Sequence, residues 1–423
     1  MFKLNLMKEG ININNFELID AFFIRNLRIN CGDSGGKLAE KLHFNKTYLY
    51  YVESGEKRLS EDLLNKILSY YNVNYNKDIN VYNEAYDLTI KLYESFVFKN
   101  NELSAMYEKE FYEKQELFAY SRGFIFNDLM IAIINLLRDK TLTKMKLDES
   151  KKYLSLYDSN IACIYGVIYG FGKGIYKNLN DSGQMIYGIF EKFPVQSLLP
   201  CVKGMFYYQL GRISYEEKRY IKALKFYNEA ICALQQIYCV ERVNQANIEI
   251  ANTLQYMRQY NDAEDLYYKM LEEAHRYNYN KRIRMCLNNL AYSYLIQKQY
   301  DKCIEFVYKA KNAGSVQHDL NYYLAYCVYK TKSREEARSL VAKLLQDEDN
   351  RYTARMLKMI QGFINDNTGK IDRYFSLIKN DIIQLNDALE MKLLYEMVIS
   401  YYMDKNDSKC MELCKDYFAL EKS

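Results

Sequence analysis

The sequence predicts an all-α protein, and three observations support that prediction. The 423 residues include only two prolines and 17 glycines, where average usage would supply about twenty and thirty. From about residue 80 onward the apolar residues recur only at helical spacing. Beyond residue 200 this pattern repeats every 34 to 40 residues, which is typical of stacked helix pairs. We therefore expect a small helical module followed by a right-handed α-solenoid.

Composition and charge narrow the classes of protein to consider. Apolar residues make up 49% of the chain and charged residues 26%, as in folded globular proteins, which excludes collagen-like and disordered classes. The net charge of +4 is too small to indicate a general binder of polyanions. The first residues lack the apolar core of a signal peptide, and no apolar run approaches the ~18 residues that span a bilayer. We expect a cytoplasmic protein that does not enter the membrane.

Residues 16–73 predict a module of five short helices. Ser34, Asn45 and Ser60 each stand where a side-chain oxygen can cap the N-terminus of the next helix. Gly55 follows the helix expected over the preceding turn, and glycine suits the left-handed residue that commonly ends a helix.

A family resemblance lies in residues 38–73, in the segment LAEKLHFNKTYLYYVESGEKRLSEDLLNKILSYYNV. This segment resembles the Cro/repressor-type (XRE) helix-turn-helix family. Order and spacing match at Leu38, Ala39, Leu42, Leu49, Val52, Glu53 and Gly55. In such a motif Leu49 and Val52 bury the back of the third helix. The resemblance therefore implies a recognition helix, residues 46–53, whose front is free to enter the major groove of DNA.

The same resemblance assigns roles to residues on and around the recognition helix. Arg28 and Glu53 occupy positions that pair across the first and third helices of the family, and such a pair fixes the angle of the recognition helix. The residues expected to contact base edges or phosphates are Lys46, Thr47, Tyr50, Tyr51, Lys37, Lys57 and Arg58. The alternative is that these are solvated side chains on a small helical bundle.

Two departures from the family pattern bear on how the module would bind DNA. Gly35 and Gly36 stand where the family often has a polar residue, which removes a phosphate contact. Nine Lys and Arg residues balance nine Asp and Glu residues over 17–78. Because phosphate neutralisation supplies most non-specific affinity, a neutral monomer would bind DNA weakly. We therefore expect a homodimer on two half-sites of double-stranded DNA, about 34 Å apart.

The clearest repeat unit spans residues 204–237 and resembles the tetratricopeptide consensus. Its small residues Gly211 and Ala223 allow the two helices of a pair to touch, while larger residues such as Tyr227 fill the space between pairs. The pattern recurs after 40, 40 and 34 residues, and more weakly towards the end of the chain. We predict three domains: a DNA-binding domain at 1–78, a helical connector with degenerate repeats at 79–200, and a tetratricopeptide array at 201–423.

The first helices of such repeats line a concave groove. Asparagine and glutamine suit an extended peptide, because one amide side chain can donate to and accept from its backbone, and tyrosine adds apolar area. Arg212 could hold a carboxylate. The consensus positions that face the groove are Tyr208, Arg212, Tyr215, Gln245, Asn252, Gln255, Tyr256, Asn288, Tyr292, Tyr322 and Tyr326. The alternative is that a chain rich in tyrosine and asparagine places these residues everywhere.

Catalytic and metal-binding patterns are missing from the sequence. His43, His275 and His318 stand far apart, without the spacing of a zinc site. Glycines at 170–174 match no phosphate-binding motif. The ten cysteines form no CxxC pair and fall mostly in apolar helical patterns, where cysteine packs as a small hydrophobe. We expect no enzyme activity, no metal and no cofactor.

An XRE-type module followed by a tetratricopeptide array resembles the RRNPP family of peptide-responsive cytosolic receptors. The resemblance implies that a short signalling peptide binds the concave groove and changes the fit of the dimer to two operator half-sites. In that family such control serves quorum sensing, and here it would regulate sporulation, toxin or virulence genes. The alternative is a Rap-like interaction scaffold, in which the array sequesters a signalling protein and the N-terminal module is secondary.

Overall fold

The computed structural model describes residues 13–138, 147–148, 150–175, 179–385 and 387–422. The chain divides into two compact units, unit 1 (Met1–Ala246) and unit 2 (Asn247–Ser423). The predicted all-α class is confirmed, because every regular element of the described residues is a helix and their one β-type pairing is an isolated bridge between Asn76 and Ser121. Among the helices in these ranges, none is both long and apolar enough to cross a membrane.

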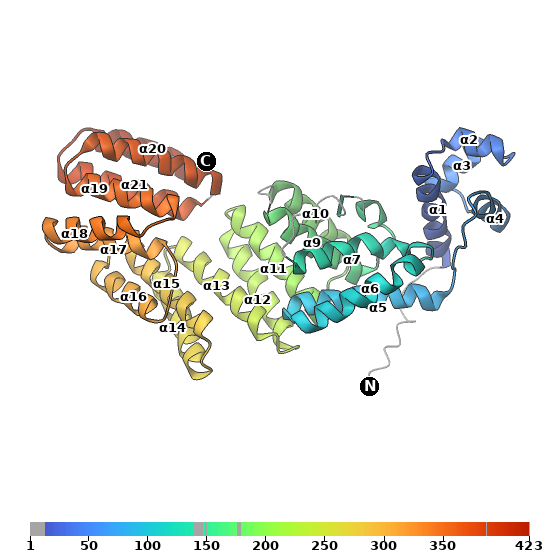
Figure 1. Cartoon of the computed structure of the whole chain (residues 1–423), viewed down its shortest axis with the longest axis horizontal. Coiled ribbons are helices and arrows are strands. Elements are labelled where there is room, and N and C mark those ends of the chain that lie inside the picture. The colour runs from blue at the N-terminus through green and yellow to red at the C-terminus, as the bar shows by residue number, and fades with distance from the viewer. Residues whose placement is uncertain (1–12, 139–146, 149, 176–178, 386, 423) are drawn as a thin grey trace. The chain divides into compact units, whose positions relative to one another are not determined.

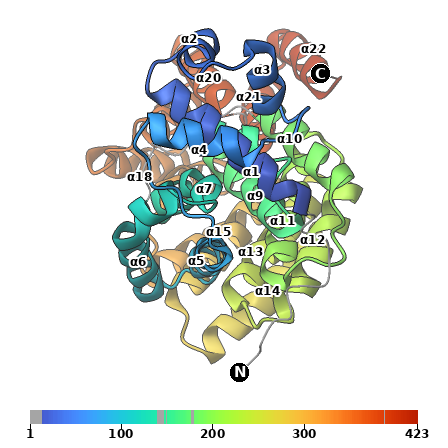
Figure 2. The same cartoon turned by 90° about the vertical axis from the view of Figure 1, so that its right-hand side faces the viewer.

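Unit 1 begins with a bundle of four helices, drawn in blue in Figures 1 and 2. They are α1 (Ile13–Asn30), α2 (Gly35–Lys41), α3 (Lys46–Glu53) and α4 (Glu61–Tyr70). Side-chain oxygens of Ser34, Asn45 and Ser60 accept hydrogen bonds from backbone N–H groups in the first turns of α2, α3 and α4. The fifth expected helix is not a short member of this bundle. The helix that follows, α5 (Ile79–Phe98), has 20 residues and packs against the helices after it.

The bundle packs on the next helices of unit 1 through its helix α1. The helices α5, α6 (Asn101–Ala119) and α7 (Phe124–Leu137) lie side by side (Figure 1). Phe23 of α1 stacks on Tyr75 with ring centroids 4.1 Å apart, and it meets Phe124 edge-on at 5.4 Å. Offset and edge-to-face ring pairs stabilise beyond the area they bury, so these contacts hold α1 against the first solenoid helices.

Unit 1 continues with helix pairs of the solenoid. Its remaining elements are the short 3₁₀ helix η1 (Lys151–Tyr153), α9 (Ser159–Ile175), α10 (Leu179–Lys192), α11 (Pro200–Glu216), α12 (Tyr220–Gln235) and the start of α13 (Val240–Tyr256). The helices α11 and α12 approach closely because Gly211 has no Cβ. A Cβ at this position would lie 2.5 Å from a ring carbon of Tyr227. This is the close contact that the tetratricopeptide pattern predicts.

Unit 2 consists of the end of α13 and nine further described helices. They are α14 (Tyr260–Arg276), α15 (Asn280–Ile296), α16 (Tyr300–Asn312), α17 (Asp319–Thr331), α18 (Arg334–Gln346), α19 (Arg351–Ile364), α20 (Thr368–Leu385), α21 (Ala388–Asp404) and α22 (Lys409–Lys422). One apolar cluster runs through the unit from Ala251 to Leu413.

The repeat length follows from the turns between helices. A residue with a left-handed backbone recurs every 20 residues, at Lys218, Tyr238, Arg258, Asn278 and Lys298. Each of these residues ends one helix just before the next begins. Two such turns make one 40-residue helix pair, which explains the 40-residue spacing in this part of the sequence.

Candidate nucleic-acid interface and peptide-binding residues

The helix α3 has a buried back and a solvent-facing front. Leu49 and Val52 are 1% and 0% exposed and belong to the core of the bundle. Lys46 and Thr47 at the start of the helix are exposed, Tyr50 is 64% exposed, and Tyr51 is half-buried. The structure therefore brings four of the sequence-derived DNA-contacting residues to one side of α3.

Arg28 and Glu53 form a two-pronged ion pair between α1 and α3. The Nε and Nη2 atoms of Arg28 donate to the two carboxylate oxygens of Glu53, each at 2.6 Å. Nη1 of Arg28 also donates to the backbone oxygen of Asp33 at 2.7 Å, in the turn before α2. Both side chains are largely buried, and the hydrogen bond to Glu53 raises the pKa of Arg28. Paired, parallel hydrogen bonds of this kind set an angle as well as a distance, so they fix the orientation of α3.

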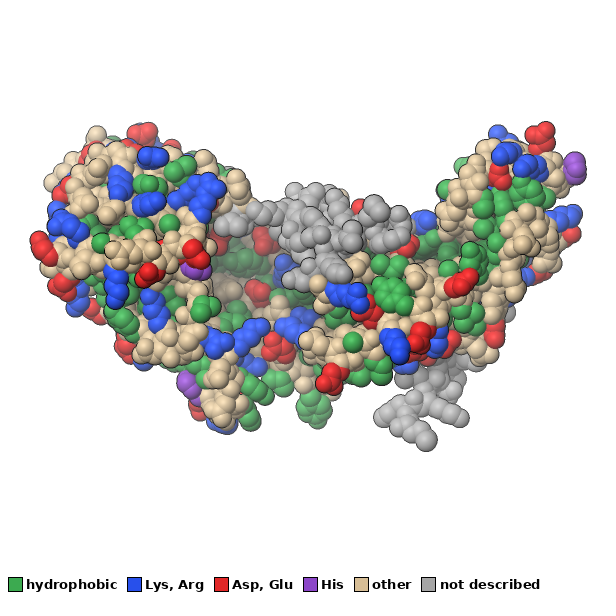
Figure 3. All heavy atoms as spheres, in the orientation of Figure 1, with side chains coloured by type: hydrophobic (Ala, Val, Ile, Leu, Met, Phe, Trp, Pro, Cys, Tyr) green, Lys and Arg blue, Asp and Glu red, His purple; other side chains and the backbone are tan. Residues whose placement is uncertain are grey.

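The basic residues that flank α3 differ in how far they are committed to other contacts. The Lys37 ammonium lies 2.7 Å from the Asp33 carboxylate, and the Arg58 guanidinium lies 3.6 Å from that of Glu17. Lys57 lies over the Tyr51 ring at 5.3 Å. Lys46 has no carboxylate partner among the described residues, and its side chain runs beside Gly36, where an added Cβ would meet it at 3.6 Å. On the face drawn in Figure 3, acidic and basic side chains of the module are interspersed.

In unit 1, three of the expected groove residues gather around the ring of Phe171 in α9. The Arg212 guanidinium carbon lies 5.8 Å from the ring centroid, and the Tyr208 ring stacks on the same ring at 6.4 Å. The Gln245 amide donates to the Tyr208 hydroxyl at 2.9 Å. Tyr208 is only 2% exposed, so its ring packs against Phe171 inside the protein. It does not line the groove, contrary to the expectation from the sequence. Tyr215 lies apart from this group, against Tyr220.

Sequence reasoning missed Arg242, which completes this group. Its guanidinium donates to the backbone oxygens of Val97 and Phe96 at the end of α5, and to the Gln245 side chain, each at 2.9 Å. Burial lowers the pKa of Arg242. Among the described residues, neither Arg242 nor Arg212 has a carboxylate partner, so two guanidiniums share one aromatic ring without a counter-ion. No local motif marks Arg242, because its backbone partners Val97 and Phe96 lie about 145 residues away.

In unit 2, the expected groove amides already make internal hydrogen bonds. The Asn252 side-chain oxygen accepts from the Tyr267 hydroxyl at 2.7 Å. Asn288 donates to Gln317 at 2.6 Å and accepts from Ser315 at 3.0 Å, both in the turn before α17. These bonds hold the two amides in place, and a peptide would use the remaining donor and acceptor positions or displace them.

The tyrosines and Gln255 show where consensus positions mislead. Tyr322, Tyr326 and Gln255 are 1%, 4% and 3% exposed, so they are buried, contrary to the expectation that they line an open groove. Each lies on the first helix of a pair, and the helices of neighbouring pairs cover the tyrosines. Tyr326, for example, meets Tyr300 and Phe363. Tyr256 and Tyr292 remain half-buried, with part of their surface open to solvent.

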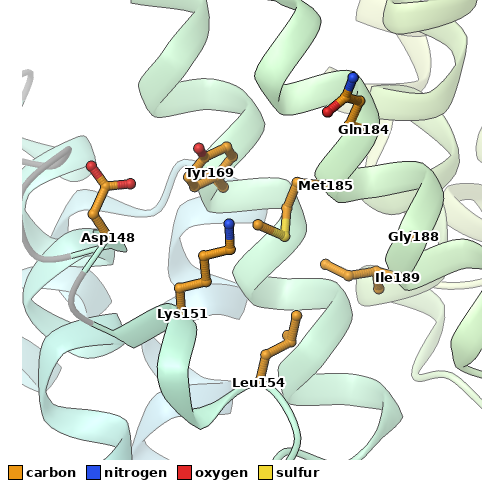
Figure 4. A pocket seen from close by; sticks show the side chains of 8 residues that line it. All are labelled: Asp148, Lys151, Leu154, Tyr169, Gln184, Met185, Gly188 and Ile189. Carbon is orange, nitrogen blue, oxygen red and sulfur yellow. The ribbon is translucent and has the colours of Figure 1, made fainter.

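Two other features of the surface lie outside the predicted sites. Figure 4 shows a cavity of about 480 Å³ in unit 1, between the η1 segment and α9 and α10. It is lined by Asp148, Lys151, Leu154, Tyr169, Gln184, Met185, Gly188 and Ile189. In unit 2, His318, Glu348 and Asp349 lie close together. Asn321 and the backbone N–H of Asn350 already hydrogen-bond the Glu348 carboxylate, which makes this group a network that joins two loops.

Comparisons with known proteins agree with the two-part architecture. Residues 24–77 match a helix-turn-helix family model, HTH_3. A search of curated proteins found no match. Among solved structures, apo NprR from B. thuringiensis is 14% identical and aligns over 80% of this chain and 99% of its own, with a TM-score of 0.60.

Two further structures show the same similarity. The apo form of RapI is 13% identical over 80% of this chain and 97% of its own, with a TM-score of 0.64. NprR in complex with its cognate peptide NprX is 14% identical over 80% and 99%, with a TM-score of 0.58. At such identities the likeness establishes the fold. The resemblance found in the sequence is thereby confirmed at the level of the fold: the chain joins an XRE-type helix-turn-helix to a helical solenoid like that of NprR and Rap proteins.

Proposed function

We propose that this chain is a cytoplasmic transcriptional regulator that binds DNA as a homodimer and is controlled by a short signalling peptide held by its solenoid. The observation that carries the DNA-binding part is the presentation of α3. The bidentate Arg28–Glu53 pair fixes this helix, while Lys46, Thr47 and Tyr50 face solvent. Fixed orientation of an exposed, capped helix is what insertion into the major groove requires.

The peptide-binding part of the proposal rests on the residues around Phe171. The half-buried guanidinium of Arg212, which has no carboxylate partner among the described residues, is placed to bind a carboxylate, and the buried Arg242 adds positive charge on the same ring. The side-chain amide of Gln245 contacts Arg242 and Tyr208, and it is placed to hydrogen-bond the backbone of a bound peptide. The fold is also that of NprR, whose structure is known in complex with its cognate peptide.

Capture of genomic DNA tests the DNA-binding part. Full-length protein is incubated with sheared DNA of the native host, and the bound fragments are sequenced. We expect discrete sites made of two half-sites, and a loss of at least about tenfold in enrichment for Lys46→Ala/Thr47→Ala, because each lost contact costs about 1–3 kcal/mol. Lys66→Ala is the matched control, since Lys66 is an exposed lysine of the same module that pairs with Asp62 on α4. Equal enrichment by the double variant and the wild type would refute the assignment of α3.

A second candidate function is a scaffold that sequesters a signalling protein. The pairing of Lys37 and Arg58 with carboxylates favours it, because these cations are less available to phosphates. If the chain is such a scaffold, a host protein co-purifies with the full-length chain, and Lys46→Ala/Thr47→Ala leaves that association unchanged.

A further inference from the structure

The carboxylate of Glu390, in the first turn of α21, lies at the meeting point of helices that are far apart in the sequence. Its Oε1 atom accepts a hydrogen bond from the hydroxyl of Tyr352 in α19 at 2.8 Å, and another from the hydroxyl of Tyr322 in α17. No hydrogen bond to the other oxygen, Oε2, is formed by the described residues. One half of this carboxylate is therefore still available to a donor.

Four tyrosine rings form a continuous wall around this carboxylate. The ring centroids are 6.3 Å apart between Tyr352 and Tyr322, 4.6 Å between Tyr322 and Tyr323, and 5.7 Å between Tyr323 and Tyr292. Tyr322 and Tyr323 are buried at the back of this wall. Tyr292, Tyr352 and Glu390 are half-buried, so this side of the wall keeps part of its surface open to solvent.

Glu390 lacks the counter-ion that other carboxylates of unit 2 have. Asp366 pairs with Arg334 at 2.7 Å and with Lys405 at 2.8 Å, and Asp372 pairs with Lys409 at 2.5 Å. Within the described part of the unit, no Lys, Arg or His nitrogen lies within 4.0 Å of the Glu390 carboxylate.

The charged groups that do face Glu390 are acidic. They are Asp387, which caps the same helix α21, and Asp319 at the start of α17, and the remaining titratable neighbours are the tyrosines of the wall. Burial, with the two aspartates, raises the pKa of Glu390 to about 7. Keeping an ionised carboxylate here costs free energy that a cation would recover.

We propose that Glu390 and the wall of Tyr292, Tyr322, Tyr323 and Tyr352 bind a primary ammonium group of the signalling peptide. A carboxylate oxygen accepts an N–H bond from the ammonium, and tyrosine faces attract the same charge. A divalent metal fits less well, because such an ion requires several oxygen ligands and the tyrosine hydroxyls already donate to Glu390. The ammonium comes from the amino terminus of the peptide or from a lysine side chain, and the inference rests on the proposed peptide-binding function.

Capture from a random peptide pool tests this subsite, and the natural peptide need not be identified first. Full-length protein is incubated at pH 7.5 with a pool of random hexapeptides in two forms, one with a free and one with an acetylated amino terminus. Bound peptides are identified by mass spectrometry. We expect at least tenfold enrichment of peptides that carry an ammonium group, because a hydrogen bond to a charged group contributes about 1.5–3 kcal/mol. Loss of binding on acetylation assigns the ammonium to the amino terminus, and an enriched lysine assigns it to the side chain.

Glu390→Gln is the decisive variant, since the amide oxygen can still accept the tyrosine hydroxyls while the charge is removed. We expect this variant to lose the preference for ammonium groups. Glu264→Gln is the matched control, because Glu264 of the same unit also accepts a tyrosine hydroxyl, that of Tyr294 at 2.9 Å, but lies outside the tyrosine wall. The control should keep the preference.

The pH dependence of capture provides a second measurement. Binding of ammonium peptides by the wild type should strengthen from pH 5.5 to 7.0 as Glu390 ionises, because a lysine amine stays protonated over this range and an α-amino group, with a pKa of about 7.7–8.0, stays mostly protonated. The Glu390→Gln variant should show no such rise. If the wild type and the Glu390→Gln variant capture the same peptides without preference for an ammonium group, the proposed ammonium subsite is wrong. The proposed peptide-binding function is then unaffected. If the wild type captures no peptide in either form, the proposed peptide-binding function fails and the subsite fails with it.

Discussion

Arg122 of the solenoid binds Asp20 of the helix-turn-helix module through two parallel hydrogen bonds. Its Nε atom donates to one carboxylate oxygen at 2.9 Å and its Nη2 atom to the other at 2.7 Å. The Tyr75 hydroxyl donates to the same carboxylate at 2.7 Å, and Asp20 is only 4% exposed. Since Asp20 lies on α1, and Arg28 of α1 orients α3, the angle of the recognition helix is tied through two ion pairs to the first solenoid helices.

Removing the Arg122–Asp20 ion pair should lower the stability of the helix-turn-helix module. In Arg122→Ala the Asp20 carboxylate stays buried without its counter-ion, which typically costs about 3–5 kcal/mol. We expect a large loss in the free energy of unfolding and faster hydrogen exchange in α1. Lys66→Ala, which removes an exposed pair with Asp62, should cost no more than about 1 kcal/mol. Equal effects of the two substitutions in urea unfolding would contradict this account.

The Arg28–Glu53 pair should matter for DNA binding more than for folding. Glu53→Gln keeps the shape of the side chain but removes the charge that Arg28 binds with two nitrogens. We expect a loss of about 1–3 kcal/mol in the free energy of unfolding, and a larger relative loss of operator affinity because α3 is no longer held at one angle. Operator titration and chemical unfolding of the same protein samples separate these effects. Unchanged operator affinity would show that α3 keeps its angle without the pair.

The close contact of α11 and α12 makes Gly211 sensitive to a single added methyl group. Gly211→Ala would place a carbon 2.5 Å from the Tyr227 ring, so the helices must separate. Such overpacking typically costs about 1–3 kcal/mol. Gly188→Ala in α10 is the control, because nothing lies within 4 Å of the added carbon there and alanine favours the helix by up to about 1 kcal/mol. Thermal unfolding should shift in opposite directions for the two variants.

The sequence predicts local features well because they depend on neighbours in the chain. The caps at Ser34, Asn45 and Ser60, and the buried back of α3, follow from residues within one or two helical turns. The burial of Tyr322 and Tyr326 does not follow from neighbours in the chain, since it depends on how far each helix pair is rotated against the next pair.

The functional groups that the sequence did not reveal are those assembled over long separations. Glu390 lies 38 residues from Tyr352 and 68 from Tyr322, and Arg242 lies 145 residues from Val97. A single glutamate or arginine in a helix carries no local signal of such partners. Only the stacking of helix pairs brings them together.

Glu390 should also make the stability of the protein depend on pH. Burial raises its pKa from 4.5 to about 7 in the folded chain, so the folded state binds this proton more tightly than the unfolded state does. The resulting stabilisation is complete below pH 4.5 and is lost as the pH rises through 7, by up to about 3 kcal/mol. We therefore expect Glu390→Gln to unfold at about the same urea concentration as the wild type at pH 4.5, and at a higher one at pH 8. Parallel pH profiles for the two proteins would mean that the Glu390 carboxylate is hydrated in the fold, because a hydrated carboxylate would keep its ordinary pKa and contribute no such difference.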